Sequence, residues 1–259
     1  VAADHVLALT RLRKPIVGIE ELVWNALDAE ASIVEITVTP NAMDGVGTVI
    51  LSDNGIGLPY EDKKSSFGKL GGSPKRRLAR TPGGRAVHGK EGKGRFRAFG
   101  IGTFVEWTFV YRDTNGTLKE WTVTGDASNL CRFKSTPPVT SKAKATGATV
   151  TISNVIASLA SLTSDAARSE LVSRLALYLR RYPGIRVVLD GKALDVNEIV
   201  ERAESYEIEA VADGGEELAA ELEVIEWTQD VERKLYLCTP DGFAQGEVSP
   251  GIHAKGFEF

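Results

Sequence analysis

The stretch from residue 59 to residue 99 constrains this chain most, because it is rich in glycine, lysine and arginine and has no apolar periodicity. Such a segment predicts a long loop with at most short helical pieces, and loops of this length are usually functional or disordered. Residues 63–97 alone hold twelve basic side chains and one acidic one, a net charge of +11. The rest of the chain holds nineteen basic and thirty-four acidic side chains, a net charge of −15. We therefore expect the loop to have an anionic partner or to be exposed to solvent.

The chain has the composition of a globular protein. Of its 259 residues, 42% are hydrophobic and 25% are charged, a balance that excludes intrinsic disorder. Domains commonly have roughly 100 to 200 residues, so we expect two units. No apolar run approaches the roughly 20 residues of a membrane span, so we expect no membrane partner.

The ends of the chain and its cysteines predict where the protein works. No charged and apolar leader opens the sequence, and Cys131 and Cys238 are too far apart for a zinc knuckle or a disulfide framework. We therefore expect an intracellular, cytoplasmic protein. Because the chain starts without methionine and stops at Phe257-Glu258-Phe259, in a stretch that still has a structured pattern, we also expect a piece of a longer protein.

Apolar periodicity predicts the regular elements. Two helices are expected within the first 30 residues, separated by Pro15, and a third over 165–181 that begins at Thr163 or Ser164 and ends at Pro183-Gly184. Asn115-Gly116 and Asp190-Gly191 predict turns. Strands are predicted at 33–38, 48–51, 103–111, 118–124, 148–152, 185–189 and 192–194, and those of a second sheet at 206–211, 222–227 and 234–238.

A carboxylate and an amide lie four residues apart in the second predicted helix. Glu21 and Asn25 therefore project from one face, and Asp28 follows one turn later. A glutamate can orient and deprotonate a water molecule, and an asparagine oxygen suits Mg²⁺, which prefers oxygen ligands. An ordinary polar helix face is the alternative interpretation. Glu20 is the rival base, but it lies on a different azimuth from Asn25, so the pattern favours Glu21.

Residues 53–57, Asp-Asn-Gly-Ile-Gly, directly follow a predicted strand. The carboxylate of Asp53 can accept a hydrogen bond from an exocyclic amine, and Gly55 and Gly57 allow the backbone to approach a flat ligand closely. Asp-Asn-Gly is also a common turn, so this pattern alone does not distinguish a ligand site from a turn.

A glycine-rich basic segment follows at the end of the long loop. Residues 89–97, Gly-Lys-Glu-Gly-Lys-Gly-Arg-Phe-Arg, offer glycines for a tight backbone cradle and cations around it, which suits a polyphosphate. A flexible basic loop that binds nucleic acid through its phosphates is the alternative. We interpret His88, just before this segment, as a structural or solvent-exposed residue, and Trp24 as a core residue.

The order and spacing of these motifs resemble those of one family. A helix with Glu-x-x-x-Asn-x-x-Asp-Ala, a strand that ends in Asp-x-Gly-x-Gly, a basic glycine-rich lid and a strand entered through residues 147–150, Gly-Ala-Thr-Val, are similar to the GHKL superfamily of ATPases, the Bergerat fold. Its members include gyrase B, MutL, Microrchidia proteins, histidine kinases and the heat-shock chaperones of the ninety-kilodalton class. The resemblance spans residues 15–195.

The resemblance implies a role for each matching position. Glu21 would be the general base and Asn25 the Mg²⁺ ligand. Asp53 would accept the adenine amine, beside the backbone of Gly55 and Gly57. The implied nucleotide site also includes Asp28 and Ile56. ATP and Mg²⁺ are thus the expected cofactors.

The glycine-rich segment would wrap the phosphates through its backbone amides, and its cations would add positive charge. The residues that the resemblance assigns to it are Gly89, Gly92, Lys93, Gly94, Arg95, Phe96 and Arg97. The family usually has Gly-Thr at the fourth motif, where the threonine hydroxyl supports adenine, but Ala148 stands in that place here. We include Thr149, on the other face of the strand, among the nucleotide-binding candidates; Thr146, a water molecule, or the loss of the hydroxyl are the alternatives.

The resemblance implies an α/β (α+β) fold, a Bergerat-type two-layer sandwich of a mixed sheet and helices. We expect an ATP-binding domain over residues 1–203, with a lid at 59–99, and the start of a transducer-like domain over 204–259. In relatives a basic residue of the transducer completes the phosphate site, and Arg233 and Lys234 are candidates by position. Lid closure usually accompanies dimerisation in the family, so a nucleotide-bound homodimer is expected.

Three functions follow from the resemblance. The first is Mg-dependent ATP hydrolysis that drives lid closure and a conformational or dimerisation switch in DNA handling. The second is a chaperone-like ATPase with a protein client. The third is an ATP-sensing module that does not hydrolyse, for which Ala148 is one sign. DNA and a protein client both remain candidate partners, and turnover by this chain alone is expected to be slow.

Overall fold

The computed structural model describes residues 10, 12, 14–41, 45–67, 80–85, 87–88, 94–130, 132–211, 217–228, 235–238 and 244–248. Packing divides the chain into two compact units, Val1–Leu175 with Tyr182–Leu194, and Ala176–Arg181 with Asp195–Phe259. The boundary expected between residues 203 and 204 lies inside strand β10 (Val200–Val211). Among the described residues, no helix has both the length and the apolar character that a bilayer crossing requires.

A mixed sheet forms the centre of the first unit. Counted over the described residues it has nine strands, in the order β5-β4-β3-β7-β2-β1-β8-β9, with β6 paired to β4. Its pairs are antiparallel except that of β1 with β8, which is parallel. The strands are β1 Ile33–Pro40, β2 Val46–Asp53, β3 Gly102–Arg112, β4 Leu118–Asp126, β5 Lys134–Ser135, β6 Val139–Thr140, β7 Gly147–Val155, β8 Arg186–Leu189 and β9 Lys192–Ala193.

The strands predicted for this sheet are confirmed, and so are the two turns that their sequences predicted. Gly116 has a φ of +81°, and Asp190 and Gly191 have φ values of +51° and +79°. Glycine, asparagine and aspartate adopt this left-handed conformation most easily, which is why these pairs close hairpins. The two-residue strands β5 and β6 were not predicted, because segments so short carry no periodicity.

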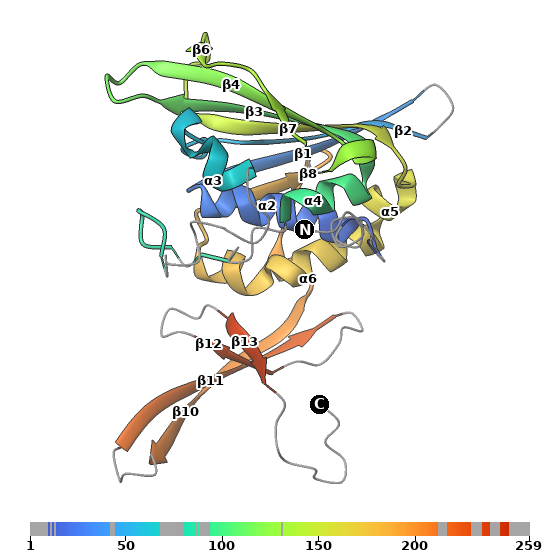
Figure 1. Ribbon diagram of the computed structural model, residues 1–259. Helices are drawn as coiled ribbons and strands as arrows, with labels where there is room; N and C mark the ends of the chain where they lie inside the picture. Colours follow the sequence, from blue (N-terminus) through green and yellow to red (C-terminus); the bar gives the residue numbers. More distant parts are fainter. Residues whose placement is uncertain are drawn as a thin grey trace. The chain divides into compact units, whose positions relative to one another are not determined.

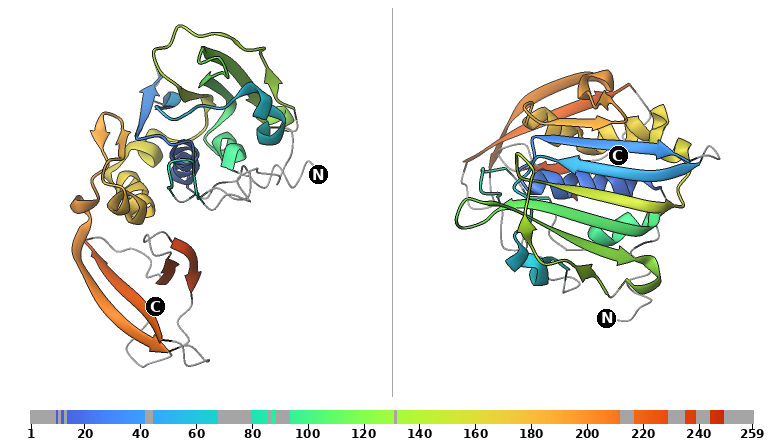
Figure 2. Two further views of the ribbon diagram at one scale, coloured as in Figure 1. Left: turned by 90° about the vertical axis from the view of Figure 1, so that its left-hand side faces the viewer. Right: turned by 90° about the horizontal axis from the view of Figure 1, so that it is seen from above.

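Helices cover one face of the sheet (Figure 1). They are α2 (Ile16–Asp28), α4 (Gly94–Arg97), α5 (Leu159–Thr163) and α6 (Asp165–Arg181). Strand β1 alternates exposed and buried residues, as expected for a sheet with one solvated face. The predicted two-layer sandwich is therefore confirmed (Figure 2). Apolar side chains that are at most 1% exposed fill the space between the layers: Ile19, Val23, Leu27, Val34, Ile36, Val49, Leu51, Ile152, Leu171 and Leu175.

The helix ends follow from their sequences. Pro15 precedes α2 directly, as a fixed φ allows at a helix start. The Ala167 N–H lies 3.2 Å from Ser164 Oγ, which caps α6 and identifies Ser164, not Thr163, as its start. The helix predicted before Pro15 lies outside the described residues except for residues 10, 12 and 14.

Short helices frame the predicted lid. The elements η1 (Tyr60–Asp62) and α3 (Lys63–Phe67) follow β2, and α4 and η3 (Ala98–Gly100) precede β3. The rings of Phe67 and Phe96 both contact Phe133, with ring centroids 5.4 Å and 6.0 Å apart. Both ends of the lid therefore pack on one aromatic side chain, which comes from the segment between η4 (Ala127–Asn129) and β5.

The second unit contains two hairpins in its described part. Strand β10 pairs with β11 (Glu217–Trp227), and β12 (Leu235–Cys238) pairs with β13 (Ala244–Val248); η5 (Val196–Glu198) precedes β10. The strands predicted at 206–211 and 222–227 are confirmed, and β10 and β11 extend beyond them. The strand predicted at 234–238 is described from Leu235 onward, and Arg233 and Lys234 lie outside the described residues.

Candidate functional site

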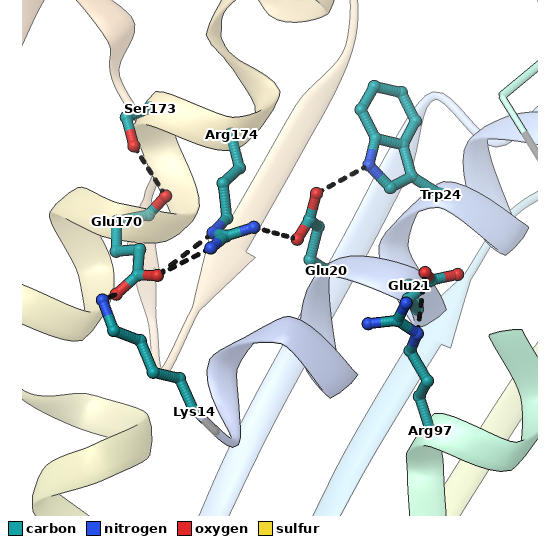
Figure 3. A network of polar contacts seen from close by, with 8 residues as sticks. All are labelled: Lys14, Glu20, Glu21, Trp24, Arg97, Glu170, Ser173 and Arg174. Carbon is teal, nitrogen blue, oxygen red and sulfur yellow. Dashed lines mark hydrogen bonds and ion pairs between the residues drawn. The ribbon is translucent and has the colours of Figure 1, made fainter. Parts of the chain in front are cut away.

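Helix α2 directs Glu20 toward helix α6 (Figure 3). Glu20 Oε2 lies 2.9 Å from Arg174 Nη1, and Trp24 Nε1 donates to Glu20 Oε1 at 3.3 Å. Arg174 is also paired with Glu170, at 2.9 Å. Glu20 therefore belongs to an ion-pair network between two helices. Both carboxylate oxygens of this rival candidate for the base are already engaged, by Arg174 and by Trp24.

Glu21, the next residue, lies beside the end of the lid. Its Oε1 atom is 3.1 Å from Arg97 Nε, and its side chain is 26% exposed. A Cβ atom built on Gly94 would lie 2.7 Å from Glu21 Oε2 and 3.4 Å from Asn25 Nδ2. The absence of a side chain at Gly94 thus allows the backbone of α4 to approach both polar groups. The structure brings together the first motif and the end of the glycine-rich segment.

Asp53 is the last residue of β2, and its carboxylate is held by the backbone. Asp53 Oδ1 accepts hydrogen bonds from the N–H groups of Gly55, at 2.8 Å, and Ala148, at 3.3 Å. Burial raises the pKa of Asp53, and the two hydrogen bonds oppose that rise only in part. The sheet thus fixes one carboxylate oxygen and presents an acceptor with a strong preference for a hydrogen-bond donor.

The turn after Asp53 is wedged between α2 and β3. The Ile56 N–H donates to the carbonyl oxygen of Ala29 at 2.8 Å, and a Cβ atom on Gly55 would lie 2.4 Å from the same oxygen. Gly57 has a φ of +71°, and a Cβ atom there would lie 2.1 Å from the carbonyl oxygen of Val110. Both glycines are therefore required by close backbone approach. The Ile56 side chain stays 51% exposed and offers an apolar surface to a flat ligand.

Strand alternation separates Thr149 from Asp53. Thr149 is paired with Ser52 across β7 and β2, and their hydroxyl oxygens are 3.3 Å apart. Successive side chains of a strand point to opposite faces, so Thr149 and Ser52 lie on the face away from the helices. Ala148 pairs with Asp53 and shares its face. We correct the expectation for Thr149 accordingly and leave it out of the candidate site.

The glycine-rich segment is described only at its end. Gly89, Gly92, Lys93 and the side chain of Arg95 lie outside the described residues. Phe96 is 3% exposed and packs on Phe133, so it can offer a ligand only its backbone. Arg97, beside Glu21, is the described cation of this segment that lies at the site.

A family model for histidine kinase-, DNA gyrase B-, and HSP90-like ATPases matches residues 14–147, a little over half of the chain. This chain belongs to that family. The matched span contains Glu21 and Asn25, Asp53 with its turn, and the whole lid. The expected membership in the GHKL superfamily is confirmed.

Two relatives of this ATPase-family chain differ in how much they share with it. The putative type II restriction enzyme HgiDII of Herpetosiphon aurantiacus is 35% identical over 86 residues, which are 33% of this chain and 13% of that protein. The MutL ATPase domain of Aquifex aeolicus complexed with ADP matches with a TM-score of 0.47 and 14% identity, over 91% of this chain and 85% of that one.

In this member of the ATPase family, contacts that the sequence did not predict join the middle of the lid to α2 and to the residues directly after it. Glu30 accepts hydrogen bonds from the Gly83 N–H at 2.7 Å and from Arg85 Nε at 3.1 Å. The backbone N–H of His88 donates to Asp28 Oδ1 at 2.9 Å, and the His88 ring stacks on the Trp24 ring with centroids 4.0 Å apart. No sequence signal pairs Glu30 with Arg85, because 55 residues separate them and Arg85 is one of many cations in the lid.

Proposed function

We propose that this chain binds Mg-ATP between helix α2, the turn after β2 and the lid, and hydrolyses it with Glu21 as general base. The observation that carries the proposal is the approach of Gly94 to Glu21 and Asn25, with Cβ distances of 2.7 Å and 3.4 Å. It places the carboxylate of the first motif at the end of the glycine-rich segment. That is where a terminal phosphate wrapped by this segment would lie.

Adenine selection is assigned to Asp53. Its carboxylate accepts hydrogen bonds but donates none when ionised, so it favours an exocyclic amine over a carbonyl oxygen. Because Oδ1 is already held by Gly55 and Ala148, the carboxylate has a fixed orientation before the ligand arrives. The exposed side chain of Ile56 would be covered by the base.

Asn25 is the residue that would hold Mg²⁺. Its side chain is exposed on α2 beside Gly94, and an amide oxygen is a suitable ligand for this hard cation. Among the described residues no group of three His, Cys, Asp or Glu side chains could hold a metal ion. This fits a cation that takes most of its ligands from phosphates and water. When bound, Mg²⁺ would neutralise part of the phosphate charge.

Arg97 and Glu21 would act on the two sides of the reacting phosphate. Glu21 would orient the attacking water and accept its proton. Arg97 pairs with Glu21 in this structure, and a guanidinium can exchange a carboxylate for a phosphate because each offers two oxygen atoms that accept its parallel N–H groups. Release of Glu21 from Arg97 would then make the carboxylate available as a base.

The direct test of binding is a calorimetric titration of the chain with ATP, GTP and adenosine, each with and without Mg²⁺. A phosphate-release assay tests hydrolysis. We expect ATP to bind more tightly than GTP and Mg²⁺ to strengthen ATP binding but not adenosine binding. Equal binding of ATP and GTP would contradict the role of Asp53. No binding of any nucleotide would contradict the proposal as a whole.

DNA handling is the process that we propose for the ATPase. The support is the 35% identity to a putative type II restriction enzyme and the net charge of +11 over residues 63–97. Binding of duplex DNA should weaken steeply with salt and should survive saturation of the site with a non-hydrolysable ATP analogue. Loss of DNA binding on saturation would mean that the lid cations serve ATP alone, and would favour a protein client.

Ala148 supports a second candidate, a module that senses ATP without hydrolysing it. Ala148 is on the Asp53 face but has no hydroxyl to support the adenine. ATP binding with negligible phosphate release, in the presence and absence of DNA, would favour the sensor over the ATPase.

We further propose that nucleotide binding drives lid closure and homodimerisation, with the unit that contains β10–β13 as the start of a transducer-like domain. Analytical ultracentrifugation with a non-hydrolysable analogue tests this part separately. A monomer at all nucleotide concentrations would contradict the dimerisation switch and leave the ATP site standing.

A further inference from the structure

Residues 80–85 and 87–88, which we call the strap, belong to the lid but are attached to the C-terminal end of α2. Within the strap, the Thr81 N–H donates to the carbonyl oxygen of Arg85 at 2.7 Å, and the Arg85 N–H donates to Thr81 Oγ1 at 3.0 Å. Thr81 is 6% exposed. Residues 81–85 of the strap therefore form a turn closed by its own hydrogen bonds. The contacts of this turn with the residues after α2 hold it in place.

Glu30 makes the principal attachment. Its carboxylate accepts from the Gly83 N–H at 2.7 Å, and Glu30 Oε2 lies 3.0 Å from Arg85 Nη2. The guanidinium also donates to the carbonyl oxygen of Ala31 at 2.8 Å. The side chains of Arg85 and Glu30 are only 13% and 20% exposed, so water screens this pair less than a surface ion pair. A Cβ atom on Gly83 would lie 2.6 Å from Glu30 Oε2, which shows how closely the strap approaches.

Burial opposes ionisation of Glu30, but the hydrogen bonds from Thr81 and Gly83 and the charge of Arg85 outweigh it. The pKa of Glu30 is consequently lowered. The folded chain thus holds Glu30 as a carboxylate at neutral pH, which the pairing with Arg85 requires.

The backbone of Glu30 is independent support for a role of its side chain. Glu30 follows α2 with a φ of +67°, the left-handed conformation that closes many helices. Glycine is the usual residue there, because it has no Cβ atom to be strained, and asparagine follows because its short side chain can form local hydrogen bonds. A strained glutamate at a glycine position indicates that its carboxylate is used.

A second attachment lies at the other end of the strap. The His88 N–H donates to Asp28 Oδ1 at 2.9 Å, and the His88 ring stacks on Trp24 with an interplanar angle of 11°. We call residues 89–97, to which we assign the phosphates, the phosphate loop. His88, directly before this loop, and Gly94, within it, both lie against helix α2.

We propose that Glu30 is a positioning residue of the ATPase: by holding the strap on α2, it fixes the starting point of the phosphate loop before nucleotide binds. This inference rests on the proposed function, because it assigns the phosphates to residues 89–97. It predicts that Glu30 affects the triphosphate more than the adenine, since the hydrogen bonds that hold Asp53 come from Gly55 and Ala148 and not from the strap.

The test uses Glu30→Gly, which removes the carboxylate and its ion pair with Arg85 but also relieves the backbone strain, so part of the loss is offset and the variant should still fold. We expect the Kd for ATP to rise on the order of tenfold, because the strap that precedes the phosphate loop is then no longer held in place before nucleotide binds. The Kd for adenosine, which has no phosphates, should stay within about twofold. Trypsin should cleave after Arg85 faster than in the wild type, because the guanidinium loses its carboxylate partner and keeps only the carbonyl oxygen of Ala31 among the contacts described above.

Two further variants complete the test. Arg85→Met removes the charge from the strap side and should weaken ATP binding as Glu30→Gly does, and the double variant should be no weaker than either single one. Glu170→Gln is the matched control, because it breaks an ion pair of α6 with Lys14 and Arg174 that does not involve the lid. It should leave the affinities for ATP and adenosine and the cleavage rate unchanged.

The outcomes separate the two proposals. Wild-type chain that binds no ATP would contradict the proposed function. Wild-type chain that binds ATP, with Glu30→Gly unchanged in ATP affinity or equally weakened for ATP and adenosine, would contradict only the positioning role of Glu30.

Discussion

Glu20 and Glu21 are neighbours on helix α2, yet their carboxylates are paired with different elements: Glu20 lies 2.9 Å from Arg174 of α6, and Glu21 lies 3.1 Å from Arg97 of α4. One glutamate thus joins two helices of the core layer, whereas the other faces the end of the lid. Because only Glu21 faces the lid, we propose a chemical role for Glu21 and a packing role for Glu20, so Glu20 serves as a matched control for Glu21.

Asp53→Asn should abolish tight ATP binding while the fold is kept. The asparagine oxygen can still accept from the Gly55 and Ala148 N–H groups, but its amide would present a donor to the adenine amine. We expect a loss of roughly a hundredfold in affinity, or about 2.7 kcal/mol. Calorimetric titration with ATP measures it, and a circular dichroism spectrum confirms the fold. Unchanged affinity would show that Asp53 does not contact the base.

The pH dependence of stability should distinguish Asp53 from its asparagine variant. Because burial raises the pKa of Asp53, the folded state holds the proton more tightly than the unfolded state does. The stability of the wild type therefore falls as pH rises from the unfolded-state pKa through the raised folded-state value. The Asp53→Asn variant has no carboxyl group at this position and lacks this loss. As the pH rises through that range, the free energy of unfolding of the variant should therefore increase relative to that of the wild type. Urea unfolding at a series of pH values tests it, and a constant difference would contradict the raised pKa.

Gly57→Ala should destabilise the chain far more than Gly116→Ala, although both glycines have a positive φ, +71° and +81°. Nothing lies within 4 Å of a Cβ atom on Gly116, so only the conformational strain applies, about 1 to 2 kcal/mol. A Cβ atom on Gly57 would also collide with the backbone oxygen of Val110 at 2.1 Å, which raises the loss above about 3 kcal/mol. Equal losses in urea unfolding would mean that the turn can move away from β3.

The fourth motif offers a pair of substitutions on opposite faces of β7. Thr149→Val should leave the ATP affinity unchanged, because Thr149 faces away from Asp53 and contacts Ser52. Ala148→Thr adds a hydroxyl on the Asp53 face and should strengthen adenine binding, by a few-fold for one added hydrogen bond of roughly 1 kcal/mol. Adenosine titrations measure both. A larger effect from Thr149→Val than from Ala148→Thr would contradict the strand register.

Local elements were predictable because their determinants are close together in the sequence. Ser164 and the Pro183-Gly184 pair define α6, and the Asn115-Gly116 turn joins β3 to β4. The first two motifs lie within 40 residues, so their place on a helix and at a strand end followed from periodicity. The two-layer arrangement then came from the resemblance to the family.

Pairings between distant segments were not predictable. Strand β7 lies between β2 and β3, and β8 joins β1 in parallel, because packing of the whole sheet determines the order. The motif alone did not show that Thr149 faces away from Asp53; the alternation of side chains along β7 did. The Glu30–Arg85 pair was not predictable either. A glutamate does not indicate a left-handed conformation, and a loop has no regular spacing from which the partner of Arg85 could be inferred.

The most direct measurement is phosphate release from Mg-ATP by the wild type, Glu21→Gln and Glu20→Gln, with ATP binding measured on each. We predict that Glu21→Gln binds ATP but loses turnover by roughly 10²- to 10⁴-fold, because the water loses its proton acceptor. Glu20→Gln should keep its turnover and lose about 1 kcal/mol of stability or less, as a partly exposed ion pair does. Turnover that survives in Glu21→Gln, or that is lost instead in a folded Glu20→Gln, would contradict the assignment of Glu21 as the base.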